Sequence, residues 1–212
     1  MNAYKSLRLR YFSFPGRAEA IRDALRIGRI DFIDEQLTHQ QFAHSREAGE
    51  FPFGGVPVMV IETDSGTQCV SQSNAILHFA GHLSGLYPSQ DPLLALKVDE
   101  VFGVVEDIGS LIGPSLHEED IDRKMSMRRK LAEETLPYWM GCLNQFLIDN
   151  GSTGYLVGNN LTVADLRLFW LIDWLTLGIL DGIPTSLIDG YEQLLAWREN
   201  ITAVRETRLA AA

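Results

Sequence analysis

The sequence is poor in cysteine, in basic residues and in long apolar runs, and each shortage narrows the class of protein. Its two cysteines, Cys69 and Cys142, lie far apart without a CxxC or metal-binding spacing, which indicates a reducing compartment and no structural disulfide. Asp and Glu outnumber Lys and Arg by 28 to 18, for a net charge of -10. A nucleic-acid surface needs clustered basic residues, so this balance argues against a nucleic-acid partner.

No segment is suited to a membrane or to secretion. The most apolar stretch, residues 166–180, is interrupted by Arg167 and Asp173 and is shorter than the ~20 residues that span a bilayer. Residues 1–5 carry one lysine, and no apolar segment of the kind found in a secretory signal follows it. We therefore expect a cytoplasmic protein without a membrane partner.

The composition that remains is ordinary for a globular protein, with 46% hydrophobic and 22% charged residues among 212. Up to residue 83, alternating and helical periodicities predict the order β-α-β-α-β-β-α, which is the order of thioredoxin-like folds. The predicted strands are 7–11, 31–37, 57–61 and 67–70, and the predicted helices are 17–27, with Gly28 just beyond its end, 40–48 and 73–83.

The pattern changes after residue 83. Residues 84–92 are rich in Gly, Pro and Ser and predict a linker. Beyond them no convincing strand pattern occurs, and periodicity predicts helices at 93–111, 122–149, 163–180 and 191–202. We therefore predict an α/β thioredoxin-like domain at residues 1–83 and an all-α domain at 93–212. Thr162 and Asp165 are close to a capping box, which we interpret as purely structural.

Two short segments of the first domain predict a site for a small anion. Gly54-Gly55-Val56-Pro57 enters a strand at Pro57, where cis bonds occur, and a cis bond would leave the backbone of Val56 unpaired and facing outward. Ser73 is expected to be the N-cap of the next helix, so that the N–H groups beyond it converge on one point. Together these segments could hold a peptide by its backbone and its carboxylate.

Other patterns point away from redox and metal chemistry. The loop at residues 13–16 occupies the place where thioredoxin-type reductases have CxxC, and it contains no cysteine, which disfavours disulfide exchange. His78 and His82 have a spacing that could hold a metal, but no third ligand suggests itself. We therefore predict no metal site and interpret these two residues as incidental helix histidines.

Five short motifs resemble, in order and spacing, those of cytosolic glutathione transferases. They are Leu9-Arg10-Tyr11-Phe12, Gly16-Arg17-Ala18-Glu19, Gly55-Val56-Pro57, Gln72-Ser73 and Leu161-Thr162-Val163-Ala164-Asp165. The pattern of a tyrosine followed by Gly-Arg-Ala-Glu resembles that of the sigma class. This class includes glutathione-dependent prostaglandin D synthases and the lens S-crystallins. The resemblance implies the glutathione transferase architecture, glutathione as co-substrate and a homodimer.

The resemblance makes Tyr11 the catalytic residue, with its hydroxyl donating to the glutathione sulfur. A free thiol of pKa ~8.5 is only a few per cent thiolate at pH 7. A hydrogen bond to a charged group is worth roughly 1.5–3 kcal/mol, or about one to two pKa units, so one such bond makes most of the bound thiol reactive. The resemblance gives Arg17 a supporting catalytic role. Its expected place in the first helical turn, where the dipole disfavours a cation, agrees with function; a surface ion pair with Glu19 or Glu35 is the alternative.

The remaining glutathione contacts are also implied by the resemblance. Val56 would pair with the cysteinyl backbone, and Gln72 and Ser73 would hold the γ-glutamyl carboxylate. At the glycine end, Phe42 and Arg46 stand in place of the family's Trp and Lys; Phe42 lacks the indole donor, whereas Arg46 keeps the charge. The expected glutathione-binding residues are Tyr11, Phe12, Arg17, Phe42, Arg46, Gly55, Val56, Pro57, Gln72 and Ser73.

The all-α domain departs from the family pattern at one position. Sigma-class dimers offer an acid from the partner subunit to the glutathione amine, and the matching residue here is Gly103. Asp99, Glu106 and Asp107 are the alternatives.

The second substrate is expected to bind in an apolar pocket lined by Phe12, Phe14, Ile108 and Ile112. Residues 108–113 supply no Trp of the kind found in the cleft wall of the synthases. We therefore predict a detoxifying enzyme that conjugates glutathione to small hydrophobic electrophiles. The alternatives are a prostaglandin D synthase-like isomerase and a non-catalytic binding or structural protein.

Overall fold

The computed structural model describes residues 4–212, which form two compact units. One unit comprises Met1–Tyr87 and Arg208–Ala212, and the other comprises Pro88–Thr207. Residues 1–3, which belong to the predicted first domain and to the segment searched for a secretory signal, lie outside the described residues. The division falls inside residues 84–92, where the linker is predicted.

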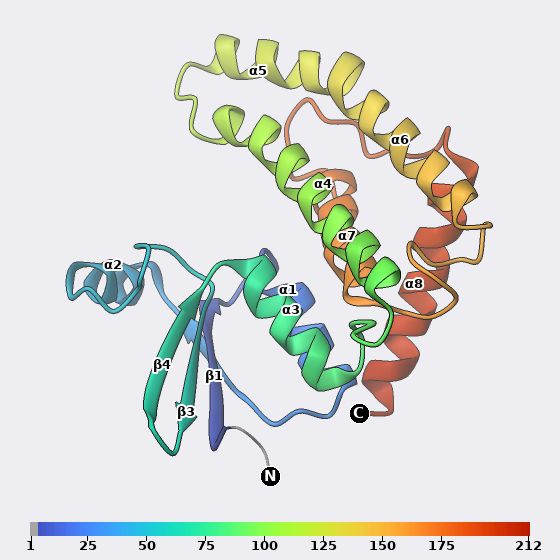
Figure 1. Ribbon diagram of the computed structural model, residues 1–212. Helices are drawn as coiled ribbons and strands as arrows, with labels where there is room; N and C mark the ends of the chain where they lie inside the picture. Colours follow the sequence, from blue (N-terminus) through green and yellow to red (C-terminus); the bar gives the residue numbers. More distant parts are fainter. Residues whose placement is uncertain (1–3) are drawn as a thin grey trace. The chain divides into compact units, whose positions relative to one another are not determined.

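The first unit contains a four-stranded sheet in the order β2-β1-β3-β4 (Figure 1). Its strands are β1 (Ser6–Phe12), β2 (Ile33–Leu37), β3 (Val58–Thr63) and β4 (Gly66–Ser71). β1 pairs in parallel with β2 and antiparallel with β3, which pairs antiparallel with β4. A parallel pair needs a crossover, and helix α1 (Glu19–Ile27) supplies it between β1 and β2.

Two helices of the first unit, α1 and α3 (Ser73–Ser84), lie side by side (Figure 1). The alternating residues Leu7 and Leu9 of β1 are buried, as are Ile21 of α1 and Leu77 of α3. Gly28 is required where the helices meet, because a Cβ at this position would lie 2.4 Å from the Cβ of Ser84. The remaining helix, α2 (His39–Glu47), contacts β2. The predicted order β-α-β-α-β-β-α is confirmed.

The second unit is all-helical, as predicted. Its helices are α4 (Pro92–Leu116), α5 (Ile121–Lys130), α6 (Leu136–Asp149), α7 (Val163–Thr176) and α8 (Glu192–Ala210), whose last turn is grouped with the first unit. The π-helical stretch Leu131–Thr135 joins α5 and α6 into one continuous rod (Figure 1). A π-helical turn is wider than an α-helical turn, and Pro137 accounts for it here because proline has no N–H with which to continue the α-helical hydrogen bonds. In the described part of the chain, no helix is both long and apolar enough to cross a membrane.

Three helix ends differ from the prediction. α7 ends at Thr176 rather than at residue 180, because Gly178 adopts the left-handed conformation (φ +76°) that terminates helices. α4 continues past Pro114 to Leu116, where the Ser115 hydroxyl donates to the carbonyl of Ile112 at 2.8 Å and holds the last turn. α8 continues to Ala210, eight residues beyond the predicted end.

The capping box before α7 is confirmed, with Asp165 at its centre. Asp165 is fully buried and accepts hydrogen bonds from the Leu156 and Thr162 backbone N–H groups, the Thr162 hydroxyl and the Trp197 indole, at 2.8–3.0 Å. Burial raises the pKa of Asp165, and the hydrogen bonds oppose this effect. The carboxyl therefore ties α7 to α8 and to the loop that precedes α7.

Candidate active site

Tyr11 lies at the end of β1 and is 7% exposed. Its hydroxyl oxygen accepts a hydrogen bond from the backbone N–H of Arg17 at 3.2 Å. Gly16 passes directly beside this oxygen, and a Cβ at position 16 would lie 2.6 Å from it. The loop after β1 therefore sets the position of the phenol, and it requires glycine at residue 16. A phenol can accept one hydrogen bond and donate another, so this geometry is compatible with donation to a ligand.

Arg17 lies before helix α1, not in its first turn as predicted. The helix begins at Glu19 with Ala18 at the N-cap position, so the argument from the helix dipole does not apply to Arg17. The two ion pairs considered as alternatives are made by other arginines: Glu19 pairs with Arg22 at 2.8 Å, and Glu35 pairs with Arg10 at 3.0 Å. Arg17 is exposed, and among the described residues its side chain makes no hydrogen bond or ion pair.

Sequence reasoning missed Arg22, a buried residue of α1. Its guanidinium donates to the carbonyl oxygen of Phe12 at 2.9 Å and to Asp34 of β2 at 3.0 and 3.1 Å. Its central carbon lies 5.8 Å from the centre of the Tyr11 ring. Burial opposes the charge, but the bonds to Glu19 and Asp34 outweigh it and the pKa of Arg22 is raised. The Glu19–Arg22 spacing on a helix, next to buried Ile21, was the signal that could have found this residue.

The segment before β3 has the predicted cis bond between Val56 and Pro57. β3 itself begins at Val58, one residue later than predicted. The backbone of Val56 lies outside the ladders of the sheet and forms none of the loop hydrogen bonds of the described residues. Val56 is half-buried, and its backbone has the unpaired character that the sequence predicts.

Gln72, not Ser73, occupies the N-cap position of α3, so the predicted cap is wrong. Ser73 is buried and is the first helical residue, and no side-chain capping bond forms at this end. Gln72 has φ +77°, a conformation that is uncommon for residues other than glycine and costs about 1–3 kcal/mol. This backbone lets the chain pass from the end of β4 at Ser71 directly into the helix. The helix N-terminus favours an anion.

The two residues expected at the glycine end differ in their surroundings. Phe42 stacks on Phe51 at 5.6 Å between ring centres, meets Phe12 edge-on at 5.4 Å and packs against the small core of Leu37, Phe51 and Val58. Its ring is thus a packing group. Arg46 is exposed, and its Nε lies 3.6 Å from the place where a Cβ on Gly54 would stand. α2 therefore brings the Arg46 charge to the loop that leads to Val56.

The expected electrophile pocket draws on both units. In the first unit, the rings of Phe12 and Phe14 stack at 5.1 Å. Ile108 and Ile112 of α4 are fully buried and expose no surface to a ligand. The pocket formed by these four residues stays a prediction.

The acid expected from a partner subunit also stays a prediction. Gly103 is exposed, and no neighbouring atom lies within 4 Å of where its Cβ would stand. Of the three alternatives, Glu106 pairs with Arg167 at 2.7 Å, while Asp99 and Asp107 are exposed.

Comparison with known proteins shows which proteins this chain resembles. A family model described as glutathione S-transferase, C-terminal domain, matches residues 106–206. Glutathione S-transferase P of Caenorhabditis elegans is 27% identical over 209 residues, which cover 97% of this chain and 94% of the relative. Human hematopoietic prostaglandin D synthase is 26% identical over 197 residues, covering 93% and 90%. The solved structure of prostaglandin synthase D from Nilaparvata lugens has a TM-score of 0.82 and 26% identity, and the match covers 98% and 96%.

A thioredoxin-like sheet followed by an all-helical unit is the architecture of these relatives. The chain is similar to cytosolic glutathione transferases along nearly its whole length, and hematopoietic prostaglandin D synthases are among the proteins that it resembles. The predicted resemblance and the predicted fold class are therefore confirmed, and the resemblance implies glutathione as a substrate.

Proposed function

We propose that this protein is a glutathione transferase that conjugates the glutathione thiolate to small hydrophobic electrophiles. The observation that carries the proposal is the phenol of Tyr11, held at the end of β1 by the Arg17 N–H at 3.2 Å, with Gly16 leaving room beside it. We also propose that the protein is cytoplasmic and forms a homodimer, because both are usual in the family.

Three parts of the first unit would hold glutathione. The backbone of Val56, beside Gly55 and Pro57, would pair with the cysteinyl residue. Gln72 and Ser73 would hold the γ-glutamyl carboxylate, since the N-terminus of α3 favours an anion. Arg46 would hold the glycine carboxylate, and Phe12 and Phe42 would pack beside the glycine end of glutathione. Support for this arrangement comes from the Val56 backbone, which makes no hydrogen bond to the described residues, and from the positive φ of Gln72.

The chemistry follows from these contacts. The Tyr11 hydroxyl donates to the glutathione sulfur and stabilises the thiolate, whose proton leaves to solvent. The thiolate then attacks the electrophilic carbon, a carbon–sulfur bond forms, and the leaving group departs with the electron pair. Arg17, an exposed cation without a protein partner among the described residues, would stabilise the same negative charge. Holding both substrates together, with the electrophile near Phe12 and Phe14, supplies much of the rate.

A second candidate is a glutathione-dependent isomerase, favoured by the names of two similar proteins, the human and Nilaparvata lugens prostaglandin D synthases. In such a reaction the thiolate adds to the substrate and then leaves, so the product contains no glutathione. Mass spectrometry of the product therefore distinguishes isomerisation from conjugation.

Retention on glutathione-agarose and conjugation of chlorodinitrobenzene test the proposal together. We expect the protein to be retained and to conjugate. Tyr11→Phe should lose most conjugation while it is still retained, because the ring fills the same space and only the donor is missing. Tyr155→Phe, on a tyrosine of the second unit whose hydroxyl makes no hydrogen bond to the described residues, is the matched control. Unchanged conjugation in Tyr11→Phe would contradict the assignment, and retention without conjugation by the native protein would indicate a binding protein.

A further inference from the structure

Two histidines on α3 take no part in the proposed chemistry. His78 and His82 lie one helical turn apart on the same face. Their Nε2 atoms are 3.1 Å apart, and their rings are almost parallel, with planes 5° apart and centres separated by 4.9 Å. The two imidazoles therefore bring the same nitrogen atom of each ring close together.

A buried aromatic ring supports both imidazoles. Tyr87, which is 8% exposed, has its ring centre 4.0 Å from that of His78 and 4.8 Å from that of His82. Contact with this fixed ring restricts the histidine rotamers in advance, so less side-chain entropy is lost when both rings bind one ligand. The face of an aromatic ring also favours a nearby positive charge.

The distance between the nitrogens suits a chelate. Zn–N bonds are about 2.0–2.1 Å long, which puts two nitrogens on one tetrahedral or octahedral ion about 2.8–3.4 Å apart. The observed 3.1 Å lies within this interval. The χ2 torsion of histidine has a broad energy well, so a small rotation of each ring can turn both lone pairs toward a shared ion.

The local field also favours a cation. His82 stands in the last turn of α3, where the negative end of the helix dipole stabilises positive charge. The net charge of -10 acts in the same direction at longer range.

We propose that His78 and His82 form a bidentate site for a divalent transition-metal ion of the zinc, nickel and copper group, with water completing the coordination. Imidazole suits these ions, and Cu²⁺ binds most tightly in the general order of affinity. The ion replaces the hydrogen bond between the Nε2 atoms, and each ring then carries its proton on Nδ1.

The sequence alone predicts no metal site at this pair, because it offers no third ligand. Residues 4–212 indeed contain no group of three or more metal-binding side chains. Two imidazoles at a fixed separation still chelate, because the second binds at the high effective concentration created by the first. Binding would clamp the last two turns of α3.

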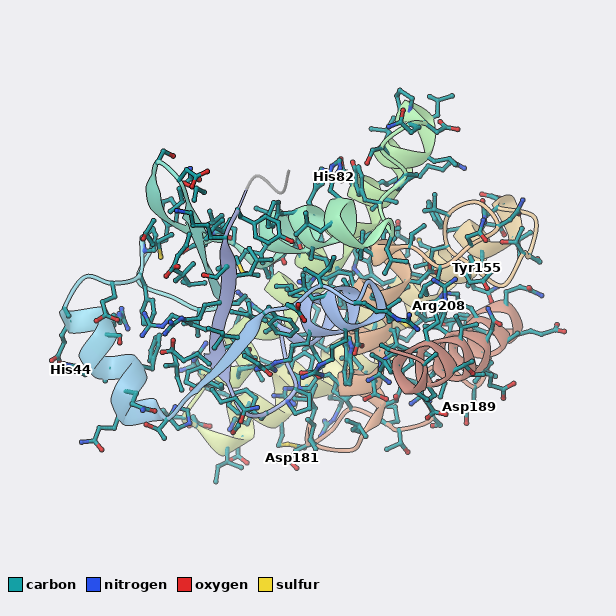
Figure 2. All side chains as sticks on the ribbon, turned by 90° about the horizontal axis from the view of Figure 1, so that it is seen from below. His44, His82, Tyr155, Asp181, Asp189 and Arg208 are labelled. Carbon is teal, nitrogen blue, oxygen red and sulfur yellow. The ribbon has the colours of Figure 1, made fainter. Side chains whose placement is uncertain are left out.

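Calorimetric titration of the chelator-treated, glutathione-free protein with ZnCl₂ tests the site. Both exposed cysteines are first replaced, as Cys69→Ser and Cys142→Ser, because their thiolates also bind zinc. We expect one ion per chain, and an affinity that falls roughly 100-fold in His82→Asn as the chelate is lost. His44→Asn is the matched control, since His44 is an exposed histidine on α2, away from His82 on α3 (Figure 2). Equal affinity in His82→Asn, or an equal loss in His44→Asn, would overturn the proposal.

A second measurement does not depend on whether His82→Asn folds, because it keeps both histidines. Electron paramagnetic resonance of the cysteine-free protein with one equivalent of Cu²⁺ should show two imidazole nitrogens bound to the ion. A spectrum with one imidazole nitrogen, or with none, contradicts the bidentate site.

Discussion

The capping box of the second unit has the residue types and hydrogen bonds that its local structure prefers, whereas the end of the sheet in the first unit departs from such preferences. Around Asp165, the carboxyl oxygens receive four hydrogen bonds and the N-cap has the residue types that a helix prefers. At the end of the sheet near Tyr11, Gln72 has a positive φ, and among the described residues the Val56 backbone forms no hydrogen bond and the exposed Arg17 side chain has no partner. The departures are concentrated where a ligand would supply the missing partners, which is where strain is expected.

Replacing the buried acid should have the largest effect on stability. Asp165→Ala leaves the Leu156, Thr162 and Trp197 donors without their acceptor, and each buried donor costs about 1–3 kcal/mol when left unpaired. We expect the free energy of unfolding to fall by at least about 3 kcal/mol, measured by urea denaturation.

The control for this prediction is Asp189→Ala, on an exposed acid whose side chain makes no hydrogen bond to the described residues. It should change stability by less than about 0.5 kcal/mol. If Asp165→Ala behaves like Asp189→Ala, the second unit does not depend on its satisfied network and the contrast between the units fails.

Filling the space beside the phenol should affect activity next most strongly. In Gly16→Ala the new Cβ would lie 2.6 Å from the Tyr11 hydroxyl oxygen, so the ring or the loop must move. A displacement of this size in a catalytic group lowers kcat/KM by about 10–100-fold, measured by chlorodinitrobenzene conjugation. Gly141→Ala, in the middle of α6 where the nearest atom is 3.8 Å away, should leave kcat/KM unchanged. Equal kcat/KM in the two variants would show that the loop does not position Tyr11.

Relaxing the backbone at the start of α3 should have the smallest effect, and its sign is the informative part. Gln72→Gly removes the strain of φ +77°, worth about 1–3 kcal/mol, but adds the flexibility of glycine, which costs about 0.5–1 kcal/mol. We expect the free energy of unfolding to rise by about 1 kcal/mol. We expect the affinity for glutathione to fall, because the variant lacks the Gln72 side-chain amide that would hold the γ-glutamyl carboxylate. Urea denaturation and calorimetric titration with glutathione measure the two quantities. A loss of stability would mean that Gln72 has a structural rather than a binding role.

The same contrast explains what the sequence could predict. The capping box and the element order follow from local periodicity, so both are found as predicted. The sequence predicts Ser73 as the cap because serine prefers that position, but the turn that follows β4 places Gln72 there instead. The predicted helix starts at residue 17, two residues before α1 begins at Glu19, and so it wrongly includes Arg17, because the apolar pattern starts at Ala18. Arg22 joins Asp34 and Phe12 through contacts distant in sequence, which periodicity does not report.

The central claim is that the Tyr11 hydroxyl stabilises the glutathione thiolate, and the pKa of the bound thiol measures this directly. Ultraviolet difference absorbance of the thiolate, recorded against pH with saturating glutathione, gives this pKa for the native protein and for Tyr11→Phe. We expect the pKa of the thiol on the native protein to lie about one to two units below that of free glutathione, and the value on Tyr11→Phe to return toward the free one. The same pKa on both proteins would contradict the account.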